Sequence, residues 1–406
     1  MDLPIYLDYA ATTPVDPQVA HLLIQHLSRG GVFGNPSSAT HPFGQAAARA
    51  VEAARVRVAT LLNADPHEII WTSGATEANN LALQGALRIC AHQGRHLITS
   101  KTEHKAVLDV CRRLERDGCV IAYLDPDPNG LIPPDRVAAA LRPDTVLVSL
   151  MHVNNETGVV QDIATIGQIT RQRGILLHVD AAQSAGKLPL DLQTLPVDLL
   201  SLSAHKLYGP KGIGALYVRQ RPHRVRLEPL LYGGGQERGL RAGTLPTHQI
   251  VAMGKACRIA SENMAVEQAR IRALRDRLWY ALAALGDVLL NGHPDDNVAG
   301  ILNLSFTGIA AEALLTAIPE IAVSTGSACT SAGNEPSHVL RAMGCDAVRA
   351  RGAVRFSLGR FTTAEEIEYT AQRVSAAIHR LRKLSPLWEL RQRGLDQRVV
   401  DWAAVP

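Results

Sequence analysis

The chain has 406 residues, of which 46% are hydrophobic and 20% are charged. This size allows two or three domains, or one large domain with a smaller one. The net charge is only +4, the basic residues are scattered and aromatic residues make up 4%, which argues against a nucleic-acid-binding protein. The sequence has no apolar run of the roughly 18 residues that a membrane helix needs, and its first residues lack the apolar core of a signal peptide. We therefore expect a soluble, cytoplasmic protein.

Residues 50–260 alternate between short apolar strands and amphipathic helices. Strands are expected at 68–72, 96–99, 120–124, 145–153, 175–179, 199–202 and 215–218, and helices at 77–92, 106–116 and 163–172. Strands that are apolar on both faces and separated by helices predict an α/β fold, with a mostly parallel sheet covered by helices on both sides. Ligands of such sheets bind beyond the carboxyl ends of the strands.

The pattern changes at about residue 262. A long charged helix at 267–285 precedes strands at 303–306, 321–324 and 354–358, and a last helix follows at 364–384. This order predicts a smaller α+β domain, on which the first dozen residues are expected to pack. We expect residues 15–262 to form the large domain, and residues 1–14 and 263–406 to form the small one.

The six cysteines are widely spaced, and no pair has the Cys-x-x-Cys spacing of a metal or redox site. His92 and His96 are four residues apart, but the intervening Gln-Gly favours a loop over a metal-binding helix face. The sequence therefore predicts no metal site of the chain's own. Most of the cysteines are expected to fill small core positions in a reducing compartment.

Lys206 follows an apolar strand and precedes a Tyr-Gly-Pro turn. A lysine at the end of a buried strand is costly unless it has a task, and one such task is a Schiff base with an aldehyde cofactor. The alternative is a surface lysine on a turn. The strand that ends at Asp180 raises a similar choice, because a buried carboxylate needs a cationic partner. That partner is either a protonated pyridine nitrogen or an ordinary structural salt bridge.

Three further strand ends carry polar residues. The SGATE segment at 73–77 opens a helix, where free amides and the helix dipole suit a phosphate, or where an ordinary helix cap is formed. Asn155 is placed to bind a ring hydroxyl or a substrate carboxylate, or to shape a turn. His104 is placed to stack on a planar ring or to carry protons, or has a structural role. Together these positions predict a pyridoxal phosphate site.

Cys329 lies in a stretch rich in glycine, serine and threonine, whereas unreactive cysteines prefer cores. A thiol there can reach a substrate and then an acceptor, or it is an exposed thiol without a role. Arg355 lies within an apolar strand, where it requires an anion. That anion is either a substrate carboxylate or the carboxylate of a buried ion pair.

The chain resembles the cysteine desulfurases of the NifS/IscS type, in the class V aminotransferase group of fold type I pyridoxal phosphate enzymes. The resemblance extends over essentially the whole chain and rests on nine motifs. They are YLDYAATTP at 6–14, GNPSS at 34–38, SGATE at 73–77, TEH at 102–104, HVNNE at 152–156, HVDAAQ at 178–183, SAHK at 203–206, RAGT at 241–244 and GSACTS at 326–331. The tail at 385–390 resembles the enzymes of iron–sulfur cluster assembly.

The resemblance implies the site residues and their roles. Lys206 carries the cofactor and moves protons, His104 stacks on the ring, Asp180 pairs with the ring nitrogen and Gln183 reaches the ring hydroxyl. The phosphate is surrounded by Ala75, Thr76, Ser203, Ala204 and His205, and by Thr244 of a neighbouring subunit, which implies a homodimer. Asn155 and Arg355 hold the substrate, with help from Asn35. Cys329 attacks the substrate sulfur and becomes a persulfide.

The implied reaction converts L-cysteine into L-alanine and protein-bound sulfur. The sulfur would pass to acceptors such as an iron–sulfur scaffold protein or proteins of transfer-RNA thiolation. The resemblance implies no metal bound by the chain itself. It implies only a transient contact between Cys329 and an iron–sulfur cluster on a scaffold partner. The alternatives are a selenocysteine lyase, another fold type I pyridoxal phosphate enzyme such as an aminotransferase, and a non-catalytic scaffold homologue. A thiol at Cys329 argues against an aminotransferase, which has no use for it.

Overall fold

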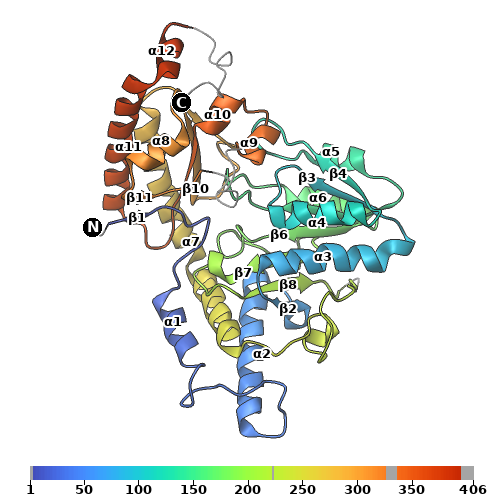
Figure 1. Cartoon of the computed structure of the whole chain (residues 1–406). Helices are drawn as coiled ribbons and strands as arrows, with labels where there is room; N and C mark the ends of the chain where they lie inside the picture. Colours follow the sequence, from blue (N-terminus) through green and yellow to red (C-terminus); the bar gives the residue numbers. More distant parts are fainter. Residues whose placement is uncertain (1–2, 222–223, 326–335, 395–406) are drawn as a thin grey trace.

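A seven-stranded sheet forms the centre of the larger part of the molecule (Figure 1). The computed structural model describes residues 3–221, 224–325 and 336–394. The strands lie in the order β2-β8-β7-β6-β5-β3-β4, with β8 antiparallel to both neighbours and the others parallel. Their bounds are β2 (Ile69–Thr72), β3 (His96–Ser100), β4 (Val120–Leu124), β5 (Thr145–Met151), β6 (Leu176–Asp180), β7 (Leu199–Ser203) and β8 (Gly214–Val218). The expected mostly parallel sheet is confirmed.

Helices cover both faces of this sheet. Successive residues of a strand point to opposite sides, and because the central strands are buried at nearly every position, both faces need a covering layer. Leu97 and Leu147 face a core formed with α3 (Ala75–Ile89) and α4 (Lys105–Arg116). Ile98 and Val148 face the opposite core. That second core is completed by α1 (Pro17–Ile24), α2 (Pro42–Leu62), α5 (Pro134–Ala140), α6 (Ile163–Gln172) and the first half of α7 (Thr247–Ala283).

The second, smaller part has its own core and its own sheets. Strands β9 (Val288–Leu290), β10 (Ile301–Phe306) and β12 (Ala353–Ser357) form an antiparallel sheet in the order β12-β10-β9. Strand β1 (Ile5–Tyr6) pairs in parallel with β11 (Ile321–Ala322), which places these two N-terminal residues on this part. The helices are α8 (Ala311–Ala317), α9 (His338–Ala342), α10 (Ala347–Arg351), α11 (Ala364–Leu384) and α12 (Pro386–Gln392).

Helix α7 leads from one part to the other, as Figure 1 shows. The sequence predicted a helix from 267, but the helix begins at Thr247, twenty residues earlier. Residues 250–260 of α7 belong to the core of the large sheet, whereas Ile271, Leu274, Leu278 and Leu282 belong to the core of the small part. One helix therefore supplies both cores. The expected division of the chain at residue 262 stays a prediction, and it falls inside α7.

None of the helices in the described ranges is both long enough and apolar enough to cross a membrane. The longest, α7, carries charged residues throughout its second half, where it lies against the small part of the molecule.

Candidate functional site

A cavity of about 570 Å³ opens beyond the carboxyl ends of the parallel strands. This is the position at which an α/β sheet binds ligands, and the volume is that of a small-molecule site. The cavity brings together most of the residues that the sequence predicted from separate segments. Those lining it are Ala75, Thr76, His104, Asn155, Asp180, Gln183, Ser203, His205, Lys206 and Arg355.

The N-terminus of α3 forms one wall of the cavity. Gly74 is the N-cap residue and provides no side-chain cap for the first-turn amides. With φ at +154°, Gly74 has a backbone conformation that residues with a side chain rarely adopt, and this turn aims the helix end at the cavity. Amides and helix dipole together favour an anion at this position. The geometry fits the expected phosphate.

Asp180 is the last residue of β6 and lies 6% exposed on the cavity wall. Its Oδ2 accepts a hydrogen bond of 2.7 Å from Asn79 Nδ2, and its Oδ1 accepts one of 2.9 Å from the Ala182 amide. Both partners are neutral donors that orient the carboxylate without cancelling its charge. A buried carboxylate held in this way is suited to a protonated ring nitrogen.

Lys206 ends the short 3-10 helix Ala204–Lys206, which follows β7 directly. Its Nζ donates to the backbone oxygens of Ala10 and, at 2.8 Å, Ala11. The neighbouring His205 has a pKa lowered to about 4, mainly by burial and further by the charges of Lys206 and other lysines. His205 is therefore neutral near pH 7. The amine reaches the cavity from the strand end, as the sequence predicted.

His104 is the N-cap residue of α4 and also lines the cavity. Its Nδ1 accepts a hydrogen bond of 3.1 Å from the Ala106 amide, so the neutral ring carries its proton on Nε2. Burial lowers the pKa of His104, with Asp180 opposing and Lys206 reinforcing this effect. A neutral imidazole on the cavity wall can stack on a ring and exchange a proton through Nε2.

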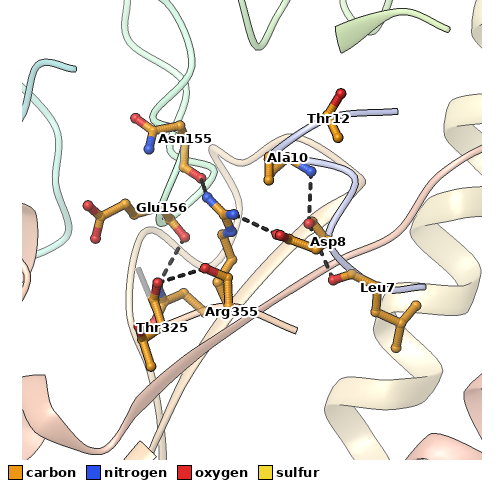
Figure 2. Close-up of polar contacts among 12 residues, drawn as sticks. Leu7, Asp8, Ala10, Thr12, Asn155, Glu156, Thr325 and Arg355 are labelled. Atoms are coloured by element: carbon orange, nitrogen blue, oxygen red, sulfur yellow. Dashed lines mark hydrogen bonds and ion pairs between the residues drawn. The ribbon is translucent and has the colours of Figure 1, made fainter. Parts of the chain in front are cut away.

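Arg355 reaches the cavity from β12 of the small part, and Figure 2 shows its guanidinium between two segments of chain. Its Nη1 donates to the Asn155 backbone oxygen at 2.8 Å, and its Nη2 donates to Asp8 Oδ1 at 2.7 Å. The side chain is 3% exposed, and Nε has no hydrogen-bond partner within the described residues. Arg355 therefore forms the buried ion pair that the sequence left open, and still lines the cavity where a substrate carboxylate is expected.

Three predicted residues do not lie on the wall of this cavity within the described part of the chain. Ala204 packs in the core, and its amide donates to the Ile213 backbone oxygen at 3.1 Å. Thr244 and Asn35 are exposed at the surface, and Asn35 Oδ1 accepts a hydrogen bond from the Ser37 amide. Cys329 lies outside the described residues.

Sequence reasoning missed several residues that support the site. Asn79, in the second turn of α3, orients the Asp180 carboxylate through a hydrogen bond. Asp8 forms an ion pair with Arg355. Glu156 is 2% exposed on the cavity wall, accepts a hydrogen bond from Ser337 Oγ, and has a pKa raised to about 7 by burial. Asn79 and Glu156 stand within or beside motifs that the sequence singled out, but only tertiary packing reveals their partners.

His338, the first residue of α9, also lines the cavity and was not predicted. Its Nε2 donates to the Glu103 backbone oxygen at 3.0 Å, and its pKa is lowered, mainly by burial. No pattern in the sequence distinguishes this histidine from a surface residue.

The lining as a whole fits pyridoxal phosphate. An amine, an imidazole, a carboxylate with neutral partners and an uncapped helix N-terminus face one cavity. These are the groups needed to hold an aldehyde, a ring face, a ring nitrogen and a phosphate.

Comparisons with known proteins agree with this geometry. Residues 5–370 match the model of the aminotransferase class-V family. The cysteine desulfurase IscS of Cronobacter sakazakii is 58% identical over 403 residues, which cover 99% of this chain and all of the relative. Among solved structures, a NifS-like protein is 36% identical with a TM-score of 0.86 over 92% of this chain and 99% of its own. SspA in complex with cysteine is 39% identical with a TM-score of 0.78 over 88% of this chain and 100% of its own. The chain belongs to the class-V aminotransferase family of pyridoxal phosphate enzymes and, within it, to the cysteine desulfurases.

Proposed function

We propose that the chain removes sulfur from L-cysteine, releases L-alanine and keeps the sulfur as a persulfide on Cys329. The observation that carries this proposal is the meeting of Lys206, Asp180, His104 and the α3 N-terminus on one cavity. The likeness to a protein solved in complex with cysteine supports the choice of substrate.

Each group has a role that follows from its position. When bound, pyridoxal phosphate supplies a ring that withdraws electrons and stabilises the charge left at the substrate α-carbon. Asp180 would hold the protonated ring nitrogen, and the α3 amides would hold the phosphate. Lys206 would hold the aldehyde and carry the α-proton, while His104 would cover the ring face and exchange a proton at Nε2.

Arg355 would bind the substrate carboxylate, with Asn155 beside it. Nη1 and Nη2 each already donate one hydrogen bond, to the Asn155 backbone oxygen and to Asp8 Oδ1. Each of these nitrogens carries two N–H groups, so the guanidinium retains donors for a further anion. Asn35 is exposed and does not line the cavity. We propose that any contact of Asn35 with the substrate is made from outside the cavity wall described above.

The sulfur transfer balances without an added oxidant. The Cys329 thiolate attacks the substrate sulfur, the Cβ–S bond breaks, and its electron pair stays on Cβ, which then takes a proton. One thiol and one cysteine thereby become one persulfide and one alanine. Thiolate is required because the thiol is a weak nucleophile.

We propose a homodimer in which Thr244 serves the site of the partner subunit. Thr244 is exposed and does not line the cavity of its own chain. The segment that carries it is fixed to α3, because Arg241 Nε donates to Glu77 Oε1 at 2.9 Å. The segment therefore presents Thr244 outward from a defined position.

Mixing two inactive variants tests this sharing. A heterodimer of Lys206→Ala and Thr244→Ala subunits contains one site with both residues intact if Thr244 acts across the interface. Cofactor binding and activity should then return at one of the two sites of each heterodimer. If Thr244 acts within its own subunit, neither site is intact and the mixture stays inactive.

The acceptors of the sulfur are proposed from resemblance. The 58% identical relatives are named IscS, and the tail of this chain resembles that group, which favours a cytoplasmic scaffold protein of iron–sulfur cluster assembly. Transfer of labelled sulfur from the persulfide enzyme to a purified scaffold protein would support this acceptor. Transfer only to a transfer-RNA thiolation protein would contradict it.

Alanine and sulfide released from L-cysteine in the presence of a thiol reductant test the activity. We expect both products in equal amounts, with a loss on the order of a thousandfold in Lys206→Ala. Lys255→Ala, at a surface position, is the matched control and should remain active. Turnover of L-selenocysteine without turnover of L-cysteine would identify a selenocysteine lyase, and conversion of the cofactor to its amine form would identify an aminotransferase.

A further inference from the structure

Lys187 contacts Gln183 but does not itself line the cofactor cavity. Its Nζ donates to Gln183 Oε1 at 2.8 Å. Gln183 lines the large cavity, whereas Lys187 lines a separate cavity of about 20 Å³ that also touches Ala10 and Lys206. Lys187 therefore has no place on the cofactor cavity wall within the described residues, and any effect on the cofactor must pass through a neighbour.

The chain brings Lys187 beneath Gln183 by a tight turn. The two residues are four apart in the segment that follows β6, and Gly186 between them has φ at +72°, in the left-handed region. A Cβ at Gly186 would lie 3.1 Å from the Ala260 Cβ, so the turn also packs closely on α7. The position of the lysine amine is thus set by the backbone.

The partners of Gln183 fix which end of its amide faces the cofactor. A backbone oxygen only accepts hydrogen bonds, and a lysine amine only donates them while it carries its proton. Burial lowers the pKa of Lys187 to about 7, and the charges of Lys206 and Arg355 act in the same direction, so the amine is purely a donor below this pH. Gln183 Oε1 faces Lys187 Nζ, and Gln183 Nε2 donates to the Ala10 backbone oxygen at 2.8 Å. A flipped amide would place donor against donor and acceptor against acceptor. Its NH₂ group therefore points to the side on which Lys206 and the cavity lie.

We propose that Lys187 is a positioning residue that holds the Gln183 amide with its NH₂ toward the cofactor. This inference rests on the proposed function, in which Gln183 reaches the ring oxygen of pyridoxal phosphate. An anionic ring oxygen requires a donor, and an amide that is free to turn offers its oxygen as readily as its nitrogen. Lys187 and the Ala10 backbone oxygen together remove that choice before the cofactor binds. Gln183 Nε2 keeps a second hydrogen besides the one that it donates to Ala10.

A double-mutant cycle on the purified enzyme tests the proposal. In Lys187→Met we expect pyridoxal phosphate to bind about tenfold more weakly. We also expect the pH midpoint of its visible absorption to move upward, because a ring oxygen without its donor holds a shared proton more tightly. In the Gln183→Ala background the same lysine substitution should change neither quantity. Lys187→Arg retains a pure donor and should behave like the wild type.

Lys255→Met is the matched control, because Lys255 Nζ donates to Gln18 Oε1 at 2.9 Å in a contact of the same kind at the surface. It should leave affinity and absorption unchanged. If Lys187→Met does not fold, Lys187→Leu, which also lacks a donor, is measured in its place.

An unchanged affinity and absorption midpoint in a folded Lys187 variant that lacks a donor would overturn the proposal, as would an equal shift in the Gln183→Ala background. If the wild type itself binds no pyridoxal phosphate, the proposed function fails instead. The two failures are therefore distinguishable.

Discussion

Arg55 and Glu237 form a buried ion pair between α2 and the segment that precedes α7. Two guanidinium nitrogens each donate to one carboxylate oxygen at 2.8 Å, and the side chains are 4% and 2% exposed. The Trp71 amide adds a hydrogen bond of 2.7 Å to Glu237 Oε2. Glu237 and Arg238 both have left-handed backbone conformations, with φ at 47° and 56°. The Glu237 carboxylate therefore stabilises a strained turn in the segment that leads to Thr244.

The substitution Glu237→Gln keeps the shape of the side chain and removes its charge. Loss of one partner of a buried pair costs about 3–5 kcal/mol, because the other charge stays buried. Glu52 Oε1 lies 3.1 Å from Arg55 Nη2 but is 63% exposed, so it compensates only in part. We expect the free energy of unfolding to fall by about 3 kcal/mol, measured by urea denaturation followed by circular dichroism at saturating cofactor.

The matched control is Asp109→Asn, which removes an exposed ion pair with Arg112. Both side chains of that pair are more than 60% exposed, so we expect a change within about 0.5 kcal/mol. Replacing both Arg55 and Glu237 by methionine should cost less than Glu237→Gln alone, because no charge remains buried. Equal stabilities of the Glu237→Gln and Asp109→Asn proteins would refute the reasoning.

Two further predictions concern the cavity wall. Burial raises the pKa of Glu156 from 4.5 to about 7, so the folded protein binds more protons than the unfolded chain between these values, and stability falls as pH rises through this window. Across this window the free energy of unfolding of Glu156→Gln should change by about 2–3 kcal/mol less than that of the wild type. Parallel profiles of the free energy of unfolding against pH for the two proteins would contradict this. Asp8→Ala should raise KM for L-cysteine about tenfold with little change in kcat, because Arg355 loses the partner that orients it. Asp8→Asn keeps an acceptor for Arg355 and should stay close to the wild type. A fall in kcat with unchanged KM would contradict this role of Asp8.

The sequence predicted the strands of the central sheet within two residues at each end, because each is an apolar run bounded by polar or turn residues. The strand expected at 145–153 ends at Met151, where the chain turns and Val153 pairs with Val160. The start of α7 was missed because its first half is buried and lacks the charged periodicity of the second half. Burial of this kind is a property of the tertiary structure.

The candidate site was predictable where a residue stands at the end of a strand. Asp180 and Lys206 were found in this way, since the carboxyl ends of parallel strands meet at one edge of a sheet. The residues that hold them were not predictable from local pattern. Asn79 lies 101 positions before Asp180, and Asp8 lies 347 positions before Arg355, so only the fold brings these partners together.

The most direct test is a single turnover with L-cysteine that compares the wild type with Cys329→Ala. We follow the cofactor spectrum, alanine and protein persulfide in the same samples. The wild type should yield one alanine and one persulfide for each occupied site, while the variant binds cysteine and stops before alanine. Equal release of alanine by both proteins would contradict the assignment of Cys329 as the sulfur acceptor.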